Sequence, residues 1–257
     1  MNDVGARARA VARYARRKMA MIADNLAQVR KRVAEACVSA GRPVESVTLL
    51  AVGKRFPADA IRVAVLEGQH RFGENQIQEA IEKIAALDEL RGRIEWHLIG
   101  PLQSNKTRVA AMSFDWIHSI DRLKIAERLS AQRPAALPPL QVCLQVNTSG
   151  EASKSGVAPA DVEALAWAVA ALPRLRLRGL MAIPEPLAGF EAQRAPHRML
   201  RKMLERLCES GLALDTLSMG MSADLEAAIA EGATMVRVGS AIFGERAGGD
   251  AQAPVGA

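Results

Sequence analysis

The sequence predicts an α/β fold: a single (β/α)8 TIM barrel with one extra helix before the first strand. Short apolar runs that are typical of buried strands alternate with helical patterns along most of the 257 residues. Eight such runs occur, and strands that are separated by helices pair in parallel through right-handed crossovers. We find no repeat, linker or second core, so one domain is the simpler interpretation. A doubly wound open sheet is the alternative.

The expected elements follow one another in a regular order. Residues 21–41, MIADNLAQVRKRVAEACVSAG, have helical periodicity, and this helix is expected to end at Gly41. The expected strands cover residues 47–54, 70–74, 94–100, 116–120, 140–147, 176–183, 216–220 and 235–244. Helical patterns separate nearly all of them. In SADLEAAIAEG, Ser222 is expected to be the N-cap and Gly232 to end the helix.

The formal net charge of +6 is concentrated at the N-terminus. Residues 1–20 hold six basic side chains and one acidic side chain, a net charge of +5, which leaves about +1 for the other 237 residues. A body so close to neutral argues against nucleic-acid binding. We therefore divide the chain into a dispensable basic extension (residues 1–20), a barrel (residues 21–246) and a Gly-rich, disordered tail (residues 247–257).

Apolar patterning and cysteine usage favour a cytoplasmic protein. No run of about 18 apolar residues is present, so no transmembrane helix is expected. The first residues also lack the apolar region of a secretory signal. Three scattered cysteines without a CxxC motif, Cys37, Cys143 and Cys208, indicate reduced, buried thiols. No metal site is expected, because His97 has no second ligand at a suitable spacing.

Polar residues and glycines gather where the expected strands end. In a barrel these C-terminal ends converge on one mouth, where active sites lie. The first strand, in VTLLAVGKRFP, ends at Lys54. A strand end usually leads into an exposed loop, but in a barrel Lys54 would point into the shared mouth. There a lysine amine can act as a nucleophile toward carbonyl groups.

Two Gly-Ser turns follow the seventh and eighth strands, in LSMGMSADLE and VRVGSAIFGER. Glycine lets backbone N–H groups approach an anion, serine hydroxyls donate, and a helix N-terminus carries partial positive charge. Tight turns alone would explain either motif equally well. Both together, on the strands after which barrels often bind phosphate, favour a phosphate site. A ligand with an aldehyde for Lys54 and a phosphate for these turns is pyridoxal phosphate.

Seven segments of the chain resemble the pyridoxal-phosphate homeostasis proteins, a family related to the barrel domain of alanine racemase. The segments are LLAVGK, RFGENQIQEA, WHLIGPLQSNK, VNTSGEASKSG, GLMAIP, LSMGMSADLEAAI and VRVGSAIFGER, between residues 21 and about 246. The resemblance implies a barrel of fold type III that holds pyridoxal 5'-phosphate as a Schiff base on Lys54. It also implies the other cofactor-binding residues: Ser218, Gly220, Ser222, Gly239 and Ser240 at the phosphate, Arg237 at the pyridine nitrogen and Asn75 near the ring.

One position departs from the family pattern. The family usually has Ser-Lys-Thr-Lys-Pro where this chain has Gly53-Lys54-Arg55-Phe56-Pro57. The tether lysine is kept, whereas Phe56 replaces a second lysine that the family uses to modulate cofactor release. The resemblance therefore does not establish how this chain exchanges its cofactor.

The resemblance implies a binding protein for intracellular pyridoxal phosphate homeostasis, without a dedicated catalytic activity. Its partners would be pyridoxal phosphate, amino acids and pyridoxal-phosphate-dependent apoenzymes, and it would be a cytoplasmic monomer that binds neither nucleic acid nor membrane. The alternative is a pyridoxal-phosphate-dependent amino-acid racemase. Such racemases add a β-domain and use a tyrosine as second base, whereas the only tyrosine here is Tyr14. A phosphosugar enzyme would explain the Gly-Ser turns but gives Lys54 a less specific task.

Overall fold

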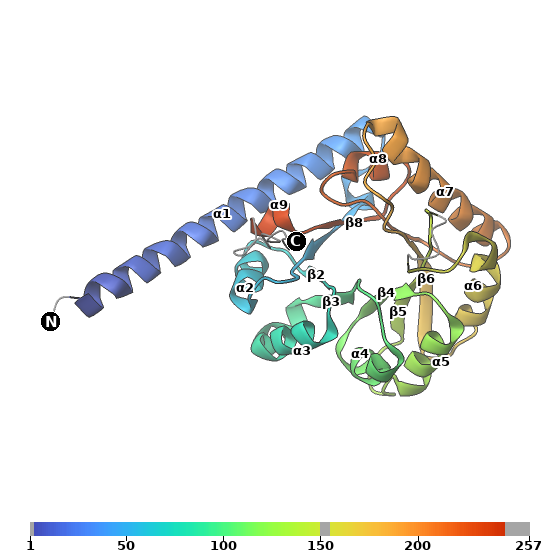
Figure 1. The fold of residues 1–257 in the computed structure, drawn as a ribbon, viewed down its shortest axis with the longest axis horizontal. Coiled ribbons are helices and arrows are strands. Elements are labelled where there is room, and N and C mark those ends of the chain that lie inside the picture. The colour runs from blue at the N-terminus through green and yellow to red at the C-terminus, as the bar shows by residue number, and fades with distance from the viewer. Residues whose placement is uncertain (1–2, 150–154, 245–257) are drawn as a thin grey trace, which may run out of the picture.

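The protein, described by a computed structural model for residues 3–149 and 155–244, is built around a closed barrel. Within these residues, eight parallel strands pair in sequence order, and β8 closes the barrel against β1 (Figure 1). The strands are β1 (Thr48–Val52), β2 (Arg71–Glu74), β3 (Glu95–Leu98), β4 (Trp116–Ile120), β5 (Leu140–Gln145), β6 (Leu175–Met181), β7 (Thr216–Ser218) and β8 (Met235–Val238). The predicted (β/α)8 barrel is confirmed, and the open-sheet alternative is wrong.

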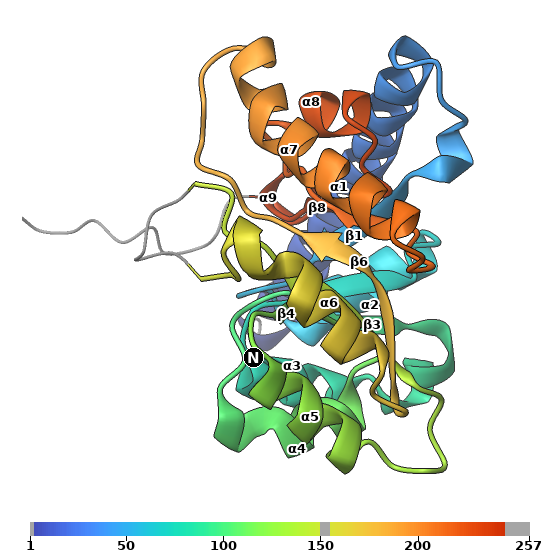
Figure 2. The same cartoon turned by 90° about the vertical axis from the view of Figure 1, so that its right-hand side faces the viewer.

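Helices cover the outside of the barrel (Figures 1 and 2). The α-helices are α1 (Asp3–Ser39), α2 (Ala58–Leu66), α3 (Ile77–Ala86), α4 (Thr107–Ser113), α5 (Leu123–Gln132), α6 (Val162–Ala170), α7 (Phe190–Glu209), α8 (Leu225–Ala230) and α9 (Ser240–Phe243). Short 3-10 helices are η1 (Val44–Ser46), η2 (Asp88–Arg93), η3 (Ser104–Lys106) and η4 (Pro159–Asp161). In the described ranges, no helix combines the length and the apolar character that are needed to cross a membrane.

One difference from the expected elements lies after β8. The sequence predicts a strand over residues 235–244, but β8 ends at Val238 and the helix α9 follows. The backbone turns at Gly239, whose φ of −116° and ψ of −82° lie outside the extended region. The amide of Phe243 then donates to the carbonyl of Gly239 at 3.1 Å. An apolar run alone does not distinguish a long strand from a short strand followed by a helical turn.

The helix after β7 begins later than the sequence predicts. α8 starts after its N-cap residue Asp224, so the expected N-cap at Ser222 is wrong. The Asp224 carboxylate instead accepts a hydrogen bond from the backbone amide of Met221 at 2.7 Å and closes the intervening turn. The predicted helix end is confirmed: Gly232 follows the helix with a φ of +92°, a left-handed conformation that favours glycine.

The extra N-terminal helix, α1, packs beside the short α9 and also contacts α8 and α2. It buries Ile22, Leu26, Val29 and Val33, a spacing that places them on one helical face. The helix begins at Asp3, well before the expected start at residue 21, and its N-terminal part extends away from the barrel (Figure 1). The expected disordered tail, residues 247–257, lies outside the described residues.

The interior of the barrel is only partly apolar. Strand side chains alternate between an outer apolar cluster, which the helices share, and the barrel interior. The inward apolar side chains form two small clusters, one of Leu50, Val52, Ile99 and Met235 and one of Trp116, Cys143 and Met181. Other inward positions hold buried polar side chains, namely His97, His118, Ser218 and Arg237.

The three cysteines are free thiols in different surroundings. Cys37 and Cys143 are buried as predicted, and burial raises the pKa of Cys143 to about 12. Cys208 on α7 is exposed, so the prediction that all three are buried is wrong. It follows the buried Leu207, and one further residue turns the side chain by about 100° around the helix.

Candidate functional site at the C-terminal mouth of the barrel

A cavity of about 460 Å³ opens at the carboxyl ends of the strands. Its lining residues are Val52, Lys54, Phe56, Asn75, Ile99, Ile183, Met221, Ser222, Ala223, Arg237, Gly239 and Ser240. Six of these twelve belong to the eight residues that the sequence analysis assigned to the site, and Ser218 and Gly220 are the two that do not line it. The barrel therefore brings together residues that are far apart in the sequence, such as Lys54 and Ser240.

Lys54 lies in a tight turn that begins where β1 ends. The backbone amide of Phe56 donates to the carbonyl of Gly53 at 2.9 Å. Between them, Arg55 has a φ of +64°, in a region that residues other than glycine rarely adopt. A Cβ on Gly53 would lie 2.6 Å from Oε1 of Glu74, so the close approach requires glycine. These constraints fix the point where the exposed Lys54 side chain leaves the backbone.

A buried ion pair supports this turn. Nζ of Lys83, on α3, donates to the carbonyl of Gly53 at 2.6 Å, to Glu74 at 2.8 Å and to Glu79 at 2.7 Å. Burial raises the pKa of Glu74 to about 7, against the opposing effect of Lys83. No sequence motif predicted a role for this lysine. Its only signal is its position on the inward face of α3, three residues after the buried Ala80.

Arg237 reaches the floor of the cavity from β8. Its Nη1 donates to the carbonyl and the hydroxyl oxygen of Ser218 at 2.6 and 2.8 Å, and its Nη2 donates to the carbonyl of Ala182 at 2.8 Å. Burial lowers the pKa of Arg237 to about 10, so the guanidinium is still charged at neutral pH. A charged guanidinium can only donate hydrogen bonds. The site therefore holds a rigid, buried cationic donor.

Ser218 and Gly220 shape the site from behind. The Ser218 hydroxyl lies between Arg237 and Nδ1 of His118, 2.8 Å from each. Gly220 has a φ of +91°, and a Cβ there would lie 2.5 Å from the Cβ of Ala228. Its carbonyl accepts the backbone amide of Arg237 at 2.9 Å. Both residues therefore position Arg237 and the β7 turn, while the turn itself presents Ser222 to the cavity.

The Gly-Ser turn after β8 and Asn75 face the same cavity. A Cβ on Gly239 would lie 3.1 Å from the carbonyl oxygen of Val52, so the turn fits tightly against β1. Oδ1 of Asn75 is buried and has no hydrogen-bond partner among the described residues. Phe56 forms part of the apolar wall and packs on Phe243, with the ring centroids 5.1 Å apart. The sequence did not predict this apolar wall, because apolar lining residues belong to no motif.

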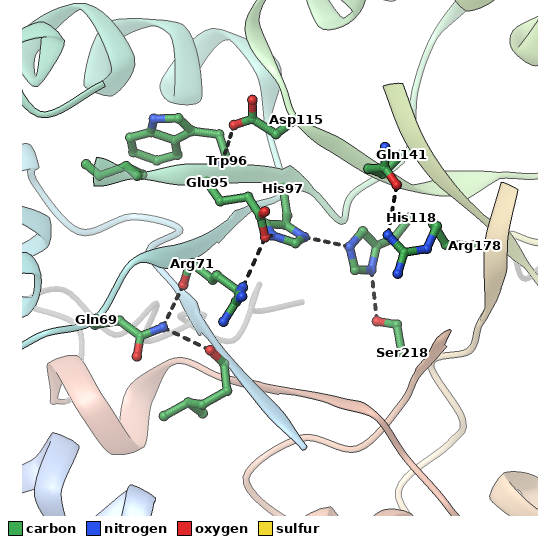
Figure 3. Close-up of polar contacts among 12 residues, drawn as sticks. Gln69, Arg71, Glu95, Trp96, His97, Asp115, His118, Gln141, Arg178 and Ser218 are labelled. Atoms are coloured by element: carbon green, nitrogen blue, oxygen red, sulfur yellow. Dashed lines mark hydrogen bonds and ion pairs between the residues drawn. The ribbon is translucent and has the colours of Figure 1, made fainter. Parts of the chain in front are cut away.

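A chain of hydrogen bonds crosses the barrel interior (Figure 3). From the Ser218 hydroxyl it runs to Nδ1 of His118 at 2.8 Å, from Nε2 of His118 to Nδ1 of His97 at 2.9 Å, and from Nε2 of His97 to Glu95 at 2.9 Å. We call these four residues the histidine chain. It connects Arg237 with the opposite mouth of the barrel, where Glu95 lies at the start of β3.

The charges at its two ends determine which atoms donate along the histidine chain. Burial lowers the pKa of His97 and His118, so both imidazoles are neutral and each has one N–H. Burial would raise the pKa of Glu95, but the interactions of its carboxylate with His97 and Arg71 together outweigh burial, so the pKa is lowered and the carboxylate stays ionised. Since Arg237 only donates and Glu95 only accepts, each residue of the chain donates toward Glu95. The Ser218 oxygen is thereby left free to accept from Arg237.

The described residues contain no group of three or more His, Cys, Asp or Glu side chains that could hold a metal ion. His97 and His118 are instead hydrogen-bonded to each other inside the barrel.

Fold and site define a barrel of the alanine racemase type, and comparison with known proteins agrees. Residues 18–247 match the family described as "Alanine racemase, N-terminal domain". A Pseudomonas aeruginosa protein named "Pyridoxal phosphate homeostasis protein" is 61% identical over 228 residues, 89% of this chain and 97% of the relative. An Escherichia coli protein of the same name is 55% identical over 226 residues, 88% of this chain and 97% of the relative. The chain belongs to the alanine racemase N-terminal domain family and, within it, to the pyridoxal phosphate homeostasis proteins.

Two solved structures show how far the likeness extends. The structure of PipY from Synechococcus elongatus with pyridoxal phosphate bound is 41% identical, with a TM-score of 0.77, and covers 87% of this chain and 100% of that one. Alanine racemase from Corynebacterium glutamicum is 18% identical, with a TM-score of 0.64, and covers 87% of this chain but 60% of that one. The second likeness is one of fold alone.

Proposed function

We propose that this chain binds pyridoxal 5'-phosphate in the cavity at the C-terminal mouth and takes part in the intracellular homeostasis of that cofactor. The names of its relatives and the pyridoxal-phosphate-bound structure of PipY support the proposal. The observation that carries it is that Lys54, Arg237, Gly239 and Ser240 line one cavity of about 460 Å³. An amine, a cationic donor and a Gly-Ser turn match the aldehyde, the ring nitrogen and the phosphate of this cofactor.

In this proposal Lys54 forms a Schiff base with the cofactor aldehyde. Its amine makes no hydrogen bond or ion pair with any other described residue, so it is available at the edge of the cavity. The phosphate lies at Ser222, Gly239 and Ser240, where hydroxyls and backbone amides can donate. The unpartnered Oδ1 of Asn75 faces the ring.

Arg237 donates to the pyridine nitrogen, with Ser218 and Gly220 as its supports rather than as direct phosphate ligands. Its bonds to Ser218 and Ala182 fix the guanidinium plane before any ligand arrives. A charged donor at the ring nitrogen disfavours protonation of that nitrogen. Pyridoxal phosphate supplies an electron sink for carbanions, and this function is strongest when the ring nitrogen is protonated.

The same residues favour a binding protein over an enzyme. A racemase needs a second base opposite the lysine, and the only tyrosine of the chain, Tyr14, lies in the N-terminal part of α1, which extends away from the barrel (Figure 1). We therefore propose no dedicated catalytic activity. Amino acids and pyridoxal-phosphate-dependent apoenzymes are the partners that a cofactor store would serve. We further propose a cytoplasmic monomer in which residues 1–20 are dispensable and residues 21–246 form the binding unit.

The absorption spectrum of the purified, full-length protein tests the tether. We expect a Schiff-base band that is lost in Lys54→Ala, and borohydride reduction should attach the cofactor mass to the peptide that contains Lys54. Lys124→Ala, an exposed lysine on α5, is the matched control and should keep the band. A band that persists in Lys54→Ala would show that another lysine is the tether.

Deuterium exchange at the α-carbon of L- and D-alanine, followed by NMR in heavy water, tests the absence of catalysis. We expect slow exchange at most. Exchange at about one turnover per second or faster would support the racemase alternative instead.

A further inference from the structure

A second cavity, of about 670 Å³, lies at the opposite mouth of the barrel, at the amino ends of strands β2 to β6. Six arginines line it: Arg71, Arg91, Arg93, Arg133, Arg176 and Arg178. Among the described lining residues the carboxylates are Glu95 and Asp115, and Asp215 pairs with Arg178 from outside the lining, so three of the six positive charges are in excess. Residues 21–257 carry about +1 in total. The basic charge of the body is therefore concentrated in this cavity, which we call the basal cavity.

Some of these arginines hold the barrel together. The guanidinium of Arg133 is buried, and it donates to the carbonyls of Ala111, Phe114 and Pro138 at 2.6 to 2.9 Å. Arg91 binds the carboxylate of Asp115 at 2.9 Å. These two have structural partners that account for their presence.

Arg178 and Arg71 are paired, but both face the cavity. Arg178 forms an ion pair with Asp215 at 2.5 Å, and its guanidinium lies 5.0 Å from the ring centre of Trp116. Arg71 binds Glu95 at 3.1 Å, and that carboxylate also accepts the last bond of the histidine chain (Figure 3). The Arg71 and Glu95 side chains are 51% and 38% exposed, so a competing anion can reach this pair.

Arg93 and Arg176 are the unexplained members. Both are exposed, and neither side chain forms a hydrogen bond or an ion pair within the described part of the chain. They come from different sides of the mouth, Arg93 from the end of η2 before β3 and Arg176 from β6. Arg176 is close enough to Asp215 to help lower the pKa of that carboxyl, but it forms no ion pair with it. A concave site that two such guanidinium groups face from separate elements is suited to a ligand with more than one anionic group.

We propose that the basal cavity binds a small oligophosphate, either free or as the phosphate chain of a nucleotide. Guanidinium groups bind phosphate oxygens in bidentate geometry, and the cavity has the volume of an ordinary small-molecule site, about 300–1,000 Å³. A long nucleic acid does not fit, because the body outside this cavity offers no extended basic surface. The site lies at the mouth opposite to the cofactor cavity and does not depend on the proposed function.

The test is calorimetric titration of tripolyphosphate into the full-length protein at about 150 mM salt, where weak surface attraction is screened. We expect saturable binding that is weakened about tenfold or more in the double variant Arg93→Ala/Arg176→Ala, because the variant removes two charged hydrogen-bond donors from the site. Arg108→Ala/Lys202→Ala removes the same charge from two exposed residues elsewhere, whose side chains form no hydrogen bond or ion pair within the described ranges. It should change the affinity by less than about twofold. ATP is titrated in parallel: tighter binding than tripolyphosphate indicates a nucleotide, and equal or weaker binding indicates a free oligophosphate.

Three results would overturn the proposal. Equal weakening in both double variants would show a general charge effect. Unchanged affinity in Arg93→Ala/Arg176→Ala would place the anion elsewhere, for example on the Gly-Ser turns of the other mouth. No binding, or binding of citrate but not of tripolyphosphate, would exclude an oligophosphate ligand.

Discussion

The two mouths of the barrel differ in how they use cationic side chains. At the C-terminal mouth, the Lys54 side chain forms no hydrogen bond or ion pair with the described residues, and Arg237 is buried beneath a cavity that also has glycine, serine and apolar lining residues. At the N-terminal mouth, the guanidinium of Arg133 donates its hydrogen bonds to backbone carbonyls. The C-terminal mouth thus offers cationic groups to its cavity, whereas Arg133 binds loop carbonyls at the N-terminal mouth.

Backbone conformation differs in the same way. The loop after β1 contains Arg55 with a φ of +64°, and the loop after β7 contains Gly220 with a φ of +91°. Left-handed residues are costly unless the surroundings impose them, and they concentrate at functional sites. No residue that lines the basal cavity has such a φ within the described ranges. In a barrel the C-terminal mouth carries chemistry while the opposite mouth carries stability. Arg93 and Arg176, whose side chains form no ion pair with the described residues, are the exception for which we propose a ligand.

The largest expected effect on stability comes from removing Lys83, which supports the turn after β1 at the C-terminal mouth. Lys83→Ala leaves Glu74 buried without its cation, and we expect a loss of about 3–5 kcal/mol in the free energy of unfolding at about pH 8. Burial raises the folded-state pKa of Glu74 from 4.5 to about 7, so its carboxyl is ionised at that pH. The loss should shrink as the pH falls to about 5 and the carboxyl becomes neutral, in urea unfolding curves measured across this range.

The sign of this pH dependence is set by the raised pKa. In the wild type, the raised pKa of Glu74 contributes to the free energy of unfolding. This contribution is fully present below the pKa of Glu74 in the unfolded state and is lost as the pH rises through about 7. Lys31→Ala is the control, since Lys31 is 77% exposed and lies 3.8 Å from Glu35. It should cost less than about 0.5 kcal/mol at any pH. A loss in Lys83→Ala that does not change with pH would contradict the assignment.

At the N-terminal mouth, Arg133→Ala should be the most damaging arginine substitution. It leaves three carbonyls without a donor, and we expect a loss of about 2–3 kcal/mol in unfolding free energy. Arg176→Ala removes the same side chain type from the same cavity and should cost less than about 0.5 kcal/mol. Equal losses in thermal or urea unfolding would mean that Arg176 has a structural role.

A smaller effect tests whether the histidine chain positions Arg237. His118→Phe removes the acceptor of the Ser218 hydroxyl, so Ser218 can turn away from Arg237. We expect pyridoxal phosphate affinity to fall by about threefold to tenfold and the absorption band of the bound cofactor to shift. Cys143→Ala changes another buried interior side chain and should lower stability without moving the band. If His118→Phe lowers only the stability and leaves the affinity and the absorption band unchanged, the histidine chain has a structural role only.

Removing residues 1–20 should have almost no effect on the cofactor. The buried stripe of α1 begins at Ile22, and the preceding part of the helix extends away from the barrel (Figure 1). A chain that starts at Met21 should bind pyridoxal phosphate within about twofold of the full chain. A larger loss in a spectroscopic titration would show that the first residues contribute to the mouth.

The smallest expected effect is a response of the C-terminal mouth to an anion that binds at the N-terminal mouth. An oligophosphate that draws Arg71 away from Glu95 changes the charge at the end of the histidine chain, whose other end is Arg237. Adding tripolyphosphate to the cofactor-loaded protein should therefore shift the cofactor band slightly, and His118→Phe should abolish that shift. A shift that survives in His118→Phe would mean that the anion acts at the C-terminal mouth directly.

Local patterns in the sequence determined the barrel and the outline of the cavity at its C-terminal mouth. Strand runs, Gly232 as a helix end, Lys54 after β1 and the Gly-Ser turns all depend on residues that are neighbours along the chain. In a barrel, strand order then brings the C-terminal ends together whatever the loops contain. This is why six of the eight expected site residues line one cavity.

Only the tertiary structure decided which partner each polar side chain meets. Ser218 turned to His118, a hundred residues away in the chain, and Lys83 turned to the carbonyl of Gly53. Whether Arg93 or Arg133 would be left free depended on which carbonyls and carboxylates the fold placed around each guanidinium. Burial and partner geometry arise from packing between distant segments, so no spacing along the sequence encodes them.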